Sequence, residues 1–378
     1  MNDVPSKNGA ERLRVLMITC EWPWPRFPGV PSAVRQPNFI ERQITFLSRA
    51  GIEVEKFGFR GGKKPLNYLT AWWRLRRLLK QRRFDLLHAQ FGQSALLPWP
   101  KRLPLVVTFR GCELLGDKGP DGCTTWAGRV MQRLCQLAAA RADAVITVSE
   151  HMFGCLPSGI RPHVIPSGLD FDALPCLPQA EARRRLDLPA TDRLVLFVGN
   201  PEEARKRCEL ARRAVDILNE SLPAKLIVAW ATPPKNIPVF MSACDVLVFT
   251  SFQEGSPNVV KEALACNLPV VSVPVADVPQ RLRGIVGCEA CSDDRPETIA
   301  AALERVLRRG QRIRGREAVQ DLDERVLTAK LIGIYRSVLG AGLSSEASEA
   351  SQNGLTSRFQ TLESGCAPRK EHSKCVAS

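Results

Sequence analysis

The chain has 378 residues, of which 44% are hydrophobic and 24% charged, and its formal net charge is +14. This length fits two domains, and the composition is that of a globular protein rather than a disordered or collagen-like one. No run reaches the ~18 consecutive apolar residues of a membrane-spanning helix, and residues 1–14 lack the apolar core of a signal peptide. We therefore expect a cytoplasmic protein.

The basic excess predicts an attraction to anions, such as nucleotide phosphates, anionic lipids or nucleic acid. The sequence has no recognisable nucleic-acid-binding motif, so phosphates and lipids are the favoured partners. Thirteen cysteines are scattered along the chain. Cys288 and Cys291 alone have the C-x-x-C spacing, and without a second such pair we expect no metal site there. Cys244 and Cys266 stand in apolar runs, which predicts that they are buried.

In chain order, short apolar runs alternate with amphipathic segments. We expect strands at 13–19, 52–59, 85–89, 105–109, 144–148 and 164–165, with helices at 37–50, 66–82 and 126–141. Three prolines between 175 and 189 mark a break, and a second series follows. Its expected strands are 194–198, 226–229, 245–250 and 268–273, and its expected helices are 210–218, 257–266, 296–307 and 324–339. Such alternation predicts an α/β protein with parallel sheets flanked by helices.

The last 38 residues, 341–378, are rich in Ser, Glu, Gly and Lys and hold few large apolar side chains. We expect this tail to be disordered. Its final four residues, Cys375 to Ser378, formally match a prenylation box. The pattern is short and nothing else in the chain indicates a eukaryotic protein, so it is not taken as a lipidation site.

Two carboxylates bracket one loop and helix of the second half. Seven residues separate Glu254 from Glu262, after one predicted strand and before another. Ser256 is a good N-cap and Pro257 suits the first helical position, while Gly255 lets a ligand approach the backbone closely. The alternative is that these acids are merely a surface residue and a capping residue.

The helix that starts here predicts an anion site, because its first N–H groups lack partners and carry the positive end of the dipole. The acids would repel a phosphate but accept hydrogen bonds from neutral hydroxyls. A nucleotide-diphosphate sugar offers both kinds of group. We predict that Glu262 holds the ribose and Glu254 the donor sugar, with Asn258 in the same site.

This segment resembles the E-x7-E signature of family 4 retaining glycosyltransferases, and the likeness covers most of Leu13 to Leu339. The resemblance implies the GT-B fold, in which two Rossmann-like domains face each other across a cleft. It implies an acceptor domain at 12–172, a linker at 173–190 and a donor domain at 191–323. A last helix, 324–340, would cross back to the first domain.

The resemblance also implies roles for residues after the first strand of the second half. Lys206 stands where the family neutralises the donor diphosphate, after Gly199. Asn200 occupies a position where the family can have an arginine, and either Arg205 or Arg207 can substitute for it. Gly29 matches a glycine loop that lies against the donor phosphates.

Arg110 departs from the family, which usually has a histidine at this position in contact with the donor sugar or the acceptor. A guanidinium cannot act as a general base, but it can bind a phosphate or a carboxylated sugar. The alternative is a structural ion pair. The resemblance further places Ser149 and Ser167 in the cleft between the domains, whereas we expect His88 to be a core histidine.

A basic segment of the first half, Leu66–Arg83, interleaves tryptophans and leucines with arginines and lysines. Such a helix can lie on an anionic membrane, so the protein is expected to be peripheral at the inner face of the membrane. The alternative is a helix that packs on the sheet with its basic face in water. Trp72 and Trp73 are adjacent and cannot both point the same way from a helix.

Together these features predict a retaining glycosyltransferase that moves a sugar from a nucleotide-diphosphate sugar to a hydroxyl acceptor. We expect the acceptor to be a carbohydrate or a lipid-linked sugar in polysaccharide or glycolipid assembly, of the kind found at bacterial surfaces. Glu254 and Arg110 are the candidate catalytic residues, and no metal or cofactor is expected. The alternatives are another enzyme of the same fold, a phosphorylase or a nucleotide-sugar epimerase, and a non-catalytic nucleotide-sugar-binding subunit.

Overall fold

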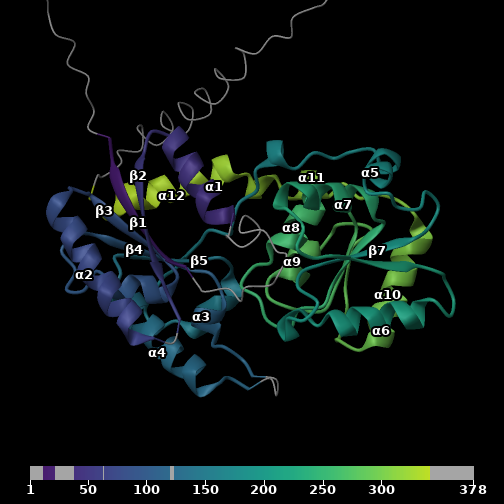
Figure 1. Ribbon diagram of the computed structural model, residues 1–378, viewed down its shortest axis with the longest axis horizontal. Coiled ribbons are helices and arrows are strands. Elements are labelled where there is room, and N and C mark those ends of the chain that lie inside the picture. The colour runs from purple at the N-terminus through teal and green to yellow at the C-terminus, as the bar shows by residue number, and fades with distance from the viewer. Residues whose placement is uncertain (1–11, 22–37, 63, 120–122, 341–378) are drawn as a thin grey trace, which may run out of the picture.

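The computed structural model describes residues 12–21, 38–62, 64–119 and 123–340, arranged as two α/β halves side by side (Figure 1). The first sheet has the order β2-β1-β3-β4-β5-β6, and all its pairings are parallel. Its strands are β1 (Arg14–Glu21), β2 (Glu53–Arg60), β3 (Leu86–Gln90), β4 (Leu105–Phe109), β5 (Ala144–Thr147) and β6 (His163–Val164).

Helices cover both faces of this first sheet, which explains why its central strands β3 and β4 are buried along their whole length, whereas β2 and β6 at its edges are partly exposed. The helices are α1 (Asn38–Arg49), α2 (Pro65–Gln81), α3 (Cys112–Leu115) and α4 (Trp126–Arg141). Successive residues of β1 enter opposite cores, because side chains of a strand alternate between faces. Val15 and Met17 pack with α1, whereas Leu16 and Ile18 pack with α2 and α4.

The second sheet has the order β11-β10-β9-β7-β8 and is also parallel throughout. Its strands are β7 (Leu194–Val198), β8 (Lys225–Ala229), β9 (Val246–Phe249), β10 (Val270–Ser272) and β11 (Glu289–Ala290). Its helices are α5 (Gln179–Arg185), α6 (Cys208–Leu218), α7 (Ile237–Ala243), α8 (Asn258–Ala265), α9 (Val278–Leu282), α10 (Pro296–Arg309) and α11 (Gly315–Ala318). The predicted α/β class with parallel sheets is confirmed.

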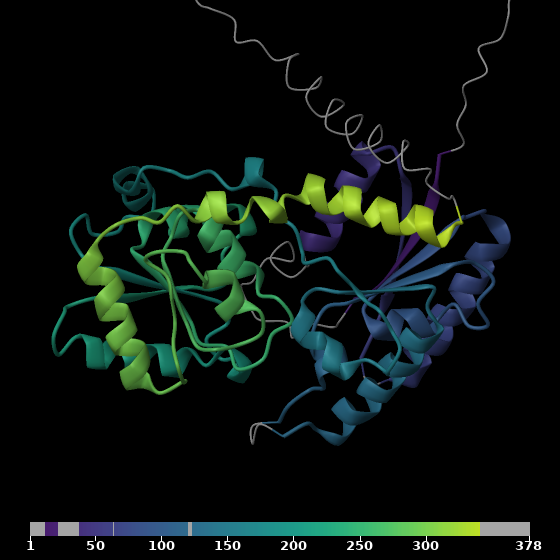
Figure 2. The ribbon, with the colours of Figure 1, turned by 180° about the vertical axis from the view of Figure 1, so that it is seen from behind.

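The last described helix, α12 (Glu324–Val338), starts beside the second half and runs along the first (Figure 2). Leu327 and Leu331 enter the same core as Val15 and Met17 of β1. Asp323, the residue just before α12, forms a short parallel β-bridge with Leu169. The chain therefore crosses between the halves twice at this point.

His88 lies fully buried on β3, as the sequence predicts for a core histidine. Its Nδ1 is 2.6 Å from the hydroxyl of Tyr335 on α12, and its Nε2 is 2.8 Å from Oγ1 of Thr108. Burial lowers the pKa of His88 to about 3, with a further contribution from Arg110. The neutral ring thus fastens the crossing helix to the first sheet. The predicted burial of Cys244 and Cys266 is likewise confirmed.

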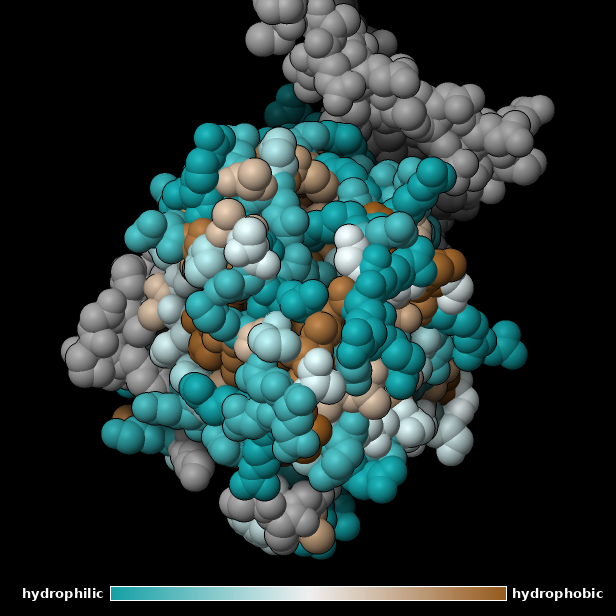
Figure 3. All heavy atoms as spheres, turned by 90° about the vertical axis from the view of Figure 1, so that its right-hand side faces the viewer, coloured by the Kyte–Doolittle hydropathy of each residue, from teal (hydrophilic) through white to brown (hydrophobic). Residues whose placement is uncertain are grey.

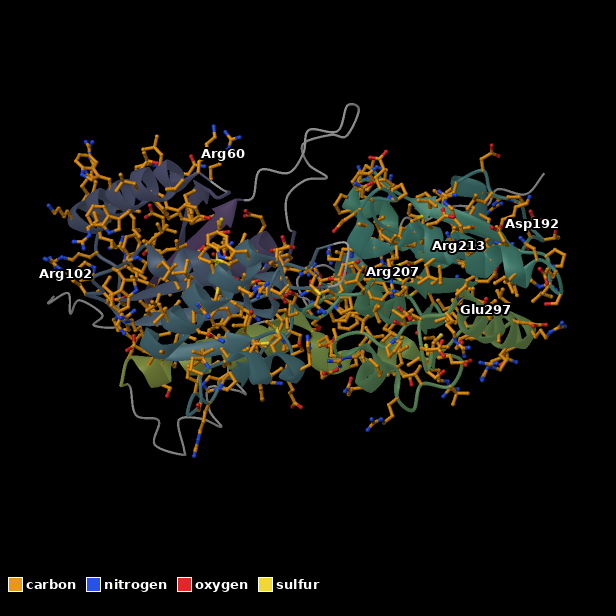
Figure 4. The ribbon with its side chains drawn as sticks, turned by 90° about the horizontal axis from the view of Figure 1, so that it is seen from below. Arg60, Arg102, Asp192, Arg207, Arg213 and Glu297 are labelled. Atoms are coloured by element: carbon orange, nitrogen blue, oxygen red, sulfur yellow. The ribbon has the colours of Figure 1, made fainter. Side chains whose placement is uncertain are left out.

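The outer end of the second half is mostly hydrophilic, with smaller groups of hydrophobic residues among the teal ones (Figure 3). Its charged residues include Arg213 on α6, Asp192 and Glu297, which lie away from the first half, whereas Arg207 lies toward it (Figure 4). Within the described ranges, no helix has the length and apolar character needed to cross a membrane.

Candidate active site

A cavity of about 340 Å³ lies where the carboxyl ends of the two sheets face each other. This is where ligands bind in open α/β sheets. The first half contributes Phe39, Arg110, Val148 and Ser167, and the second half contributes Val198, Gly199, Lys206 and residues 254–259. Most of the predicted site residues therefore meet in one cavity.

Three residues predicted for the donor site, Asn200, Arg205 and Glu262, are described by the structure but do not line this cavity. Asn200 lies just beyond Gly199, and its side-chain oxygen accepts a hydrogen bond from the backbone of Glu202 at 3.0 Å. Glu262 lies one helical turn beyond Asn258 on α8, and Arg205 reaches the cavity's Glu254 from outside. Gly29 lies outside the described residues.

The carboxylate of Glu254 is held by two cations. Its Oε1 lies 2.7 Å from Nζ of Lys206 and 2.6 Å from Nη1 of Arg205. Burial acts to raise the pKa of Glu254, but the charges of Lys206 and Arg205 outweigh it and the pKa is lowered. The group is therefore an anion at neutral pH, and Lys206 faces the cavity with its charge only partly neutralised.

A tight turn after β7 places Lys206 at the cavity. Gly199 has φ of 144°, a conformation that side chains rarely adopt. A 3-10 turn over Ala204–Lys206 follows, and the hydroxyl of Thr250 donates to the carbonyl of Lys206 at 2.8 Å. The turn lets both Arg205 and Lys206 reach Glu254, although neighbours on a regular helix point in different directions.

Helix α8 begins one residue later than predicted, and the assignment of Ser256 as its N-cap is wrong. Pro257 occupies the cap position without a side-chain cap bond, and the helix starts at Asn258. The hydroxyl of Ser256 instead donates to Oδ2 of Asp277 at 2.8 Å, in the loop after β10. The first N–H groups of α8 are thus left without a side-chain cap at the cavity.

The two halves touch through their backbones beside Glu254. A Cβ on Gly255 would lie 1.9 Å from the carbonyl oxygen of Arg110, so no side chain fits there. The hydroxyl of Ser149 donates to the carbonyl of Gly255 at 2.6 Å. Gly255 is therefore required for the approach of the two halves, in addition to the close ligand approach that its sequence position predicts.

Arg110 lies at the end of β4 with its guanidinium at the cavity. It donates to Oε1 of Gln90 from Nε at 3.0 Å and from Nη2 at 2.7 Å, and from Nη1 to the hydroxyl of Ser167 at 2.9 Å. The guanidinium carbon lies 4.7 Å from the centre of the Phe39 ring. Burial lowers the pKa of Arg110 to about 10, so it stays charged at neutral pH. In the described structure it forms no ion pair, and the alternative of a structural ion pair is not supported.

Sequence reasoning missed Lys261, which lies inside the E-x7-E segment but is buried. Its Nζ donates to the carbonyl of Ser167 at 3.0 Å, across the two halves. Burial lowers the pKa of Lys261 to about 7. Its neighbour Glu262 has a pKa raised by burial, an effect that Arg42 and Lys261 reduce. From the sequence, a lysine next to a signature glutamate is expected to be an exposed helix residue. The contact of Lys261 with Ser167 depends on the packing of α8 against the first half.

The described residues contain no group of three or more His, Cys, Asp or Glu side chains placed to hold a metal ion. The charged side chains at the cavity are Lys206, Arg110 and Glu254, and Arg205 contacts Glu254 from outside it. With the N-terminus of α8 they form an anion-binding surface beside one carboxylate that accepts hydrogen bonds.

Two family models match this chain. The first, described as a glycosyl transferase 4-like domain, matches residues 10–154, and the second, glycosyl transferases group 1, matches residues 195–309. Together they span more than half of the sequence. The chain is a family 4 glycosyltransferase of the GT-B fold.

Proteins with similar sequences are also glycosyltransferases. TuaC of Bacillus subtilis (strain 168), a glycosyltransferase assigned to teichuronic acid biosynthesis, is 27% identical over 295 residues, which cover 70% of this chain and 74% of TuaC. A D-inositol 3-phosphate glycosyltransferase of Thermobispora bispora is 24% identical, over 64% of this chain and 66% of its own length.

Solved structures share the fold of the glycosyltransferase. Sucrose-phosphate synthase from Thermosynechococcus elongatus superposes with a TM-score of 0.70 at 17% identity, covering 88% of this chain and all of that one. Anabaena HepE, solved with UDP and glucose, has a TM-score of 0.63 at 17% identity, covering 86% of this chain and all of that one.

Proposed function

We propose that this glycosyltransferase transfers a sugar, with retention at the anomeric carbon, from a nucleotide-diphosphate sugar to a hydroxyl of a saccharide or lipid-linked saccharide. The proposal rests on the pairing of Lys206 with Glu254 beside the N-terminus of α8. The lysine and the uncapped N–H groups of the helix can bind a diphosphate, and the carboxylate next to them can accept hydrogen bonds from sugar hydroxyls.

In this proposal the donor diphosphate binds between Nζ of Lys206 and the first N–H groups of α8. It then competes with Glu254 for Lys206, which frees a carboxylate oxygen for a hydroxyl of the sugar. Oδ1 of Asn258 is buried without a hydrogen-bond partner in the described structure, so it is a ready acceptor for a second donor hydroxyl. Glu262 stands one turn further on the same face of α8, where the ribose would extend.

The proposed step forms a bond between the acceptor oxygen and the anomeric carbon as the bond from that carbon to the diphosphate breaks. The acceptor proton passes to the leaving phosphate oxygen on the same face of the sugar, which gives retention. Lys206 and α8 stabilise the charge that develops on the diphosphate. Glu254, kept ionised by its cations, orients hydroxyls and is too weak a base to remove the acceptor proton.

The names of similar proteins support the donor and the pathway. TuaC is assigned to teichuronic acid biosynthesis, and HepE has been solved with UDP and with UDP-glucose. We therefore propose polysaccharide assembly as the role and a UDP-sugar as the first donor to test. Both family models and the sequence relatives TuaC and D-inositol 3-phosphate glycosyltransferase are glycosyltransferases, which favours a transferase over an epimerase, a phosphorylase or a non-catalytic subunit.

A panel of UDP-, GDP- and ADP-sugars tests the donor. We expect one nucleotide class to raise the melting temperature of the wild type, because a ligand that binds only the native state stabilises it by mass action. Glu262→Ala should weaken this shift, whereas Glu297→Ala, on α10, should not. With an acceptor, product NMR should show the anomeric configuration of the donor. Inverted product would refute retention, and the absence of any shift would refute the donor site.

We also propose that the first half contacts an anionic membrane, as the alternation of residues in α2 suggests. Leu66, Leu69 and Trp73 are more than 60% exposed, whereas Leu75 is buried and Trp72 bonds through Nε1 to the carbonyl of Trp99. The two tryptophans do point in different directions, as predicted. Thus one face of α2 packs on the sheet and the other presents apolar side chains to solvent.

Helix α4 extends the same surface. Trp126, Val130 and Leu137 are exposed, and neither α2 nor α4 contains an acidic residue. Both helices pack on the same face of the first sheet. Exposed apolar side chains on helices that carry basic and no acidic residues are complementary to anionic lipid, where a lipid-linked acceptor would be held.

Cosedimentation with vesicles tests this surface. We expect Leu69→Ser/Trp73→Ser to weaken binding to phosphatidylglycerol vesicles by about 100-fold or more, because each exposed side chain gains on the order of 1.5 kcal/mol or more when buried. Val286→Ser, an equally exposed residue of the second half, serves as the control. Wild-type binding that is equal on phosphatidylcholine, or independent of salt, would refute an electrostatic membrane contact.

A further inference from the structure

The guanidinium of Arg110 is held rigidly by neutral partners. Both of its bonds to Gln90 go to Oε1, and the amide of Gln90 is itself fixed because its Nε2 donates to Oε1 of Gln43 at 2.8 Å. Gln90 and Gln43 are buried. The stacking of Arg110 over Phe39 and its bond to Ser167 complete the support. The planar fork therefore has one orientation at the cavity.

The guanidinium of Arg110 forms no ion pair in the described structure, unlike Lys206, Arg205 and Arg42. Lys206 and Arg205 share Glu254, and Arg42 bonds to Glu324 at 3.3 Å. Glu113 accepts from the backbone N–H of Arg110 at 2.5 Å. Burial lowers the pKa of the guanidinium, and Glu324 and Glu113 oppose this larger effect only from beyond ion-pair distance. A half-buried cation with no paired carboxylate is costly. Its five N–H donors exceed the three hydrogen bonds it makes here, so donors remain for a ligand.

The position of Arg110 separates it from the proposed diphosphate site. Its carbonyl touches Gly255 from the side of the first half, whereas Lys206 approaches Glu254 from the turn after β7 in the second half. Both residues line the same cavity. A ligand with its diphosphate at Lys206 and α8 would thus bring its sugar, or the sugar that accepts it, towards Arg110.

We infer that Arg110 binds an anionic group, a carboxylate or a phosphate, carried by a sugar in this cavity. The group sits either on the donor sugar, as in a uronic acid, or on the acceptor. A guanidinium fork matches the paired oxygens of both groups and gives charge-assisted hydrogen bonds to them. Arg110 is then the residue that selects an acidic sugar over a neutral one. This inference rests on the proposed function for the nature of the donor.

Calorimetric titration of the full chain tests the inference in two arms. The donor arm compares UDP-glucuronate with UDP-glucose. The acceptor arm, with and without saturating UDP, compares glucuronate and glucose 1-phosphate with glucose. In at least one arm we expect the wild type to bind the anionic probe about 10- to 100-fold more tightly than its neutral match. The arm that shows the preference identifies the source of the anion.

Variants assign the preference to the guanidinium. Arg110→Gln should abolish it while leaving the affinity for UDP unchanged, and Arg110→Lys should keep only part of it, because lysine lacks the fork. Arg49→Gln removes another arginine stacked over a phenylalanine, Phe46, away from the cavity, and should keep the full preference. Equal binding of anionic and neutral probes in both arms, or a preference that survives in Arg110→Gln, would overturn the inference. If UDP fails to bind, the proposed donor fails, and the acceptor arm without UDP still decides the role of Arg110.

Discussion

Replacing Lys206 by methionine is expected to lower kcat/KM for the nucleotide sugar by about 10²–10³-fold, the typical effect of removing one group that stabilises developing charge. Methionine keeps much of the aliphatic chain of Lys206 beside Gly199, so the turn after β7 should survive. The loss is therefore assigned to the missing charge at the diphosphate. Steady-state kinetics with the donor found by the panel measure it.

A matched control is Lys225→Met, which removes an exposed lysine whose Nζ lies 2.5 Å from Oδ2 of Asp192 at the start of β8. Lys225 is exposed and stands at the amino end of β8, whereas the cavity lies at the carboxyl ends of the strands, so kinetics should change by less than about twofold. Unchanged kinetics in Lys206→Met would remove Lys206 from the mechanism and with it the reading of the Lys206–Glu254 pair as a donor site.

The same variant carries a prediction for the pH dependence of stability. The pKa of Glu254 is lowered from 4.5 in the folded state by Lys206 and Arg205, against the effect of burial. Its interactions therefore stabilise the native state above pH 4.5 and are lost as the pH falls through the lowered value. The difference in unfolding free energy between wild type and Lys206→Met should consequently shrink below pH 4.5. Urea unfolding at several pH values measures this difference, and a gap that widens in acid would contradict the ion pair.

Gly255→Ala is expected to reduce activity by more than about 100-fold while each half of the protein stays folded. The new Cβ would lie 1.9 Å from the carbonyl oxygen of Arg110, a contact between backbones that no side-chain rotation relieves. The two halves must then separate or tilt. Because a displacement of about 1 Å at a reacting centre costs on the order of 10²-fold, the facing residues no longer form one site.

Two measurements distinguish loss of the arrangement from loss of folding. Gly154→Ala, where a Cβ would meet nothing within 4 Å, is the control and should keep full activity. For Gly255→Ala we expect a native circular dichroism spectrum, because the new contact lies between the two halves and not within the core of either. Normal turnover by Gly255→Ala would show that this contact is not part of the active arrangement.

The local sequence predicted most of the helices and strands and many of the residues that line the cavity. Strands such as 105–109 and 194–198 are apolar runs bounded by turn residues, and the structure has them at the same residues. The pairing of Lys206 with Glu254 was also foreseeable in kind, because both follow strands of a parallel sheet whose carboxyl ends share one edge.

The remainder depends on contacts between residues far apart in the chain. Whether Ser256 caps α8 was decided by Asp277, which competes for its hydroxyl from another loop. Lys261 is buried only because α8 packs against Ser167 of the other half. The sequence alone determined the fold class, the parallel sheets and a donor-type motif, because these follow from local periodicity and spacing. Only the tertiary structure decided that the guanidinium of Arg110 reaches the cavity with no ion pair in the described residues, and that Gly255 touches the backbone of Arg110, because both facts depend on how the two halves meet.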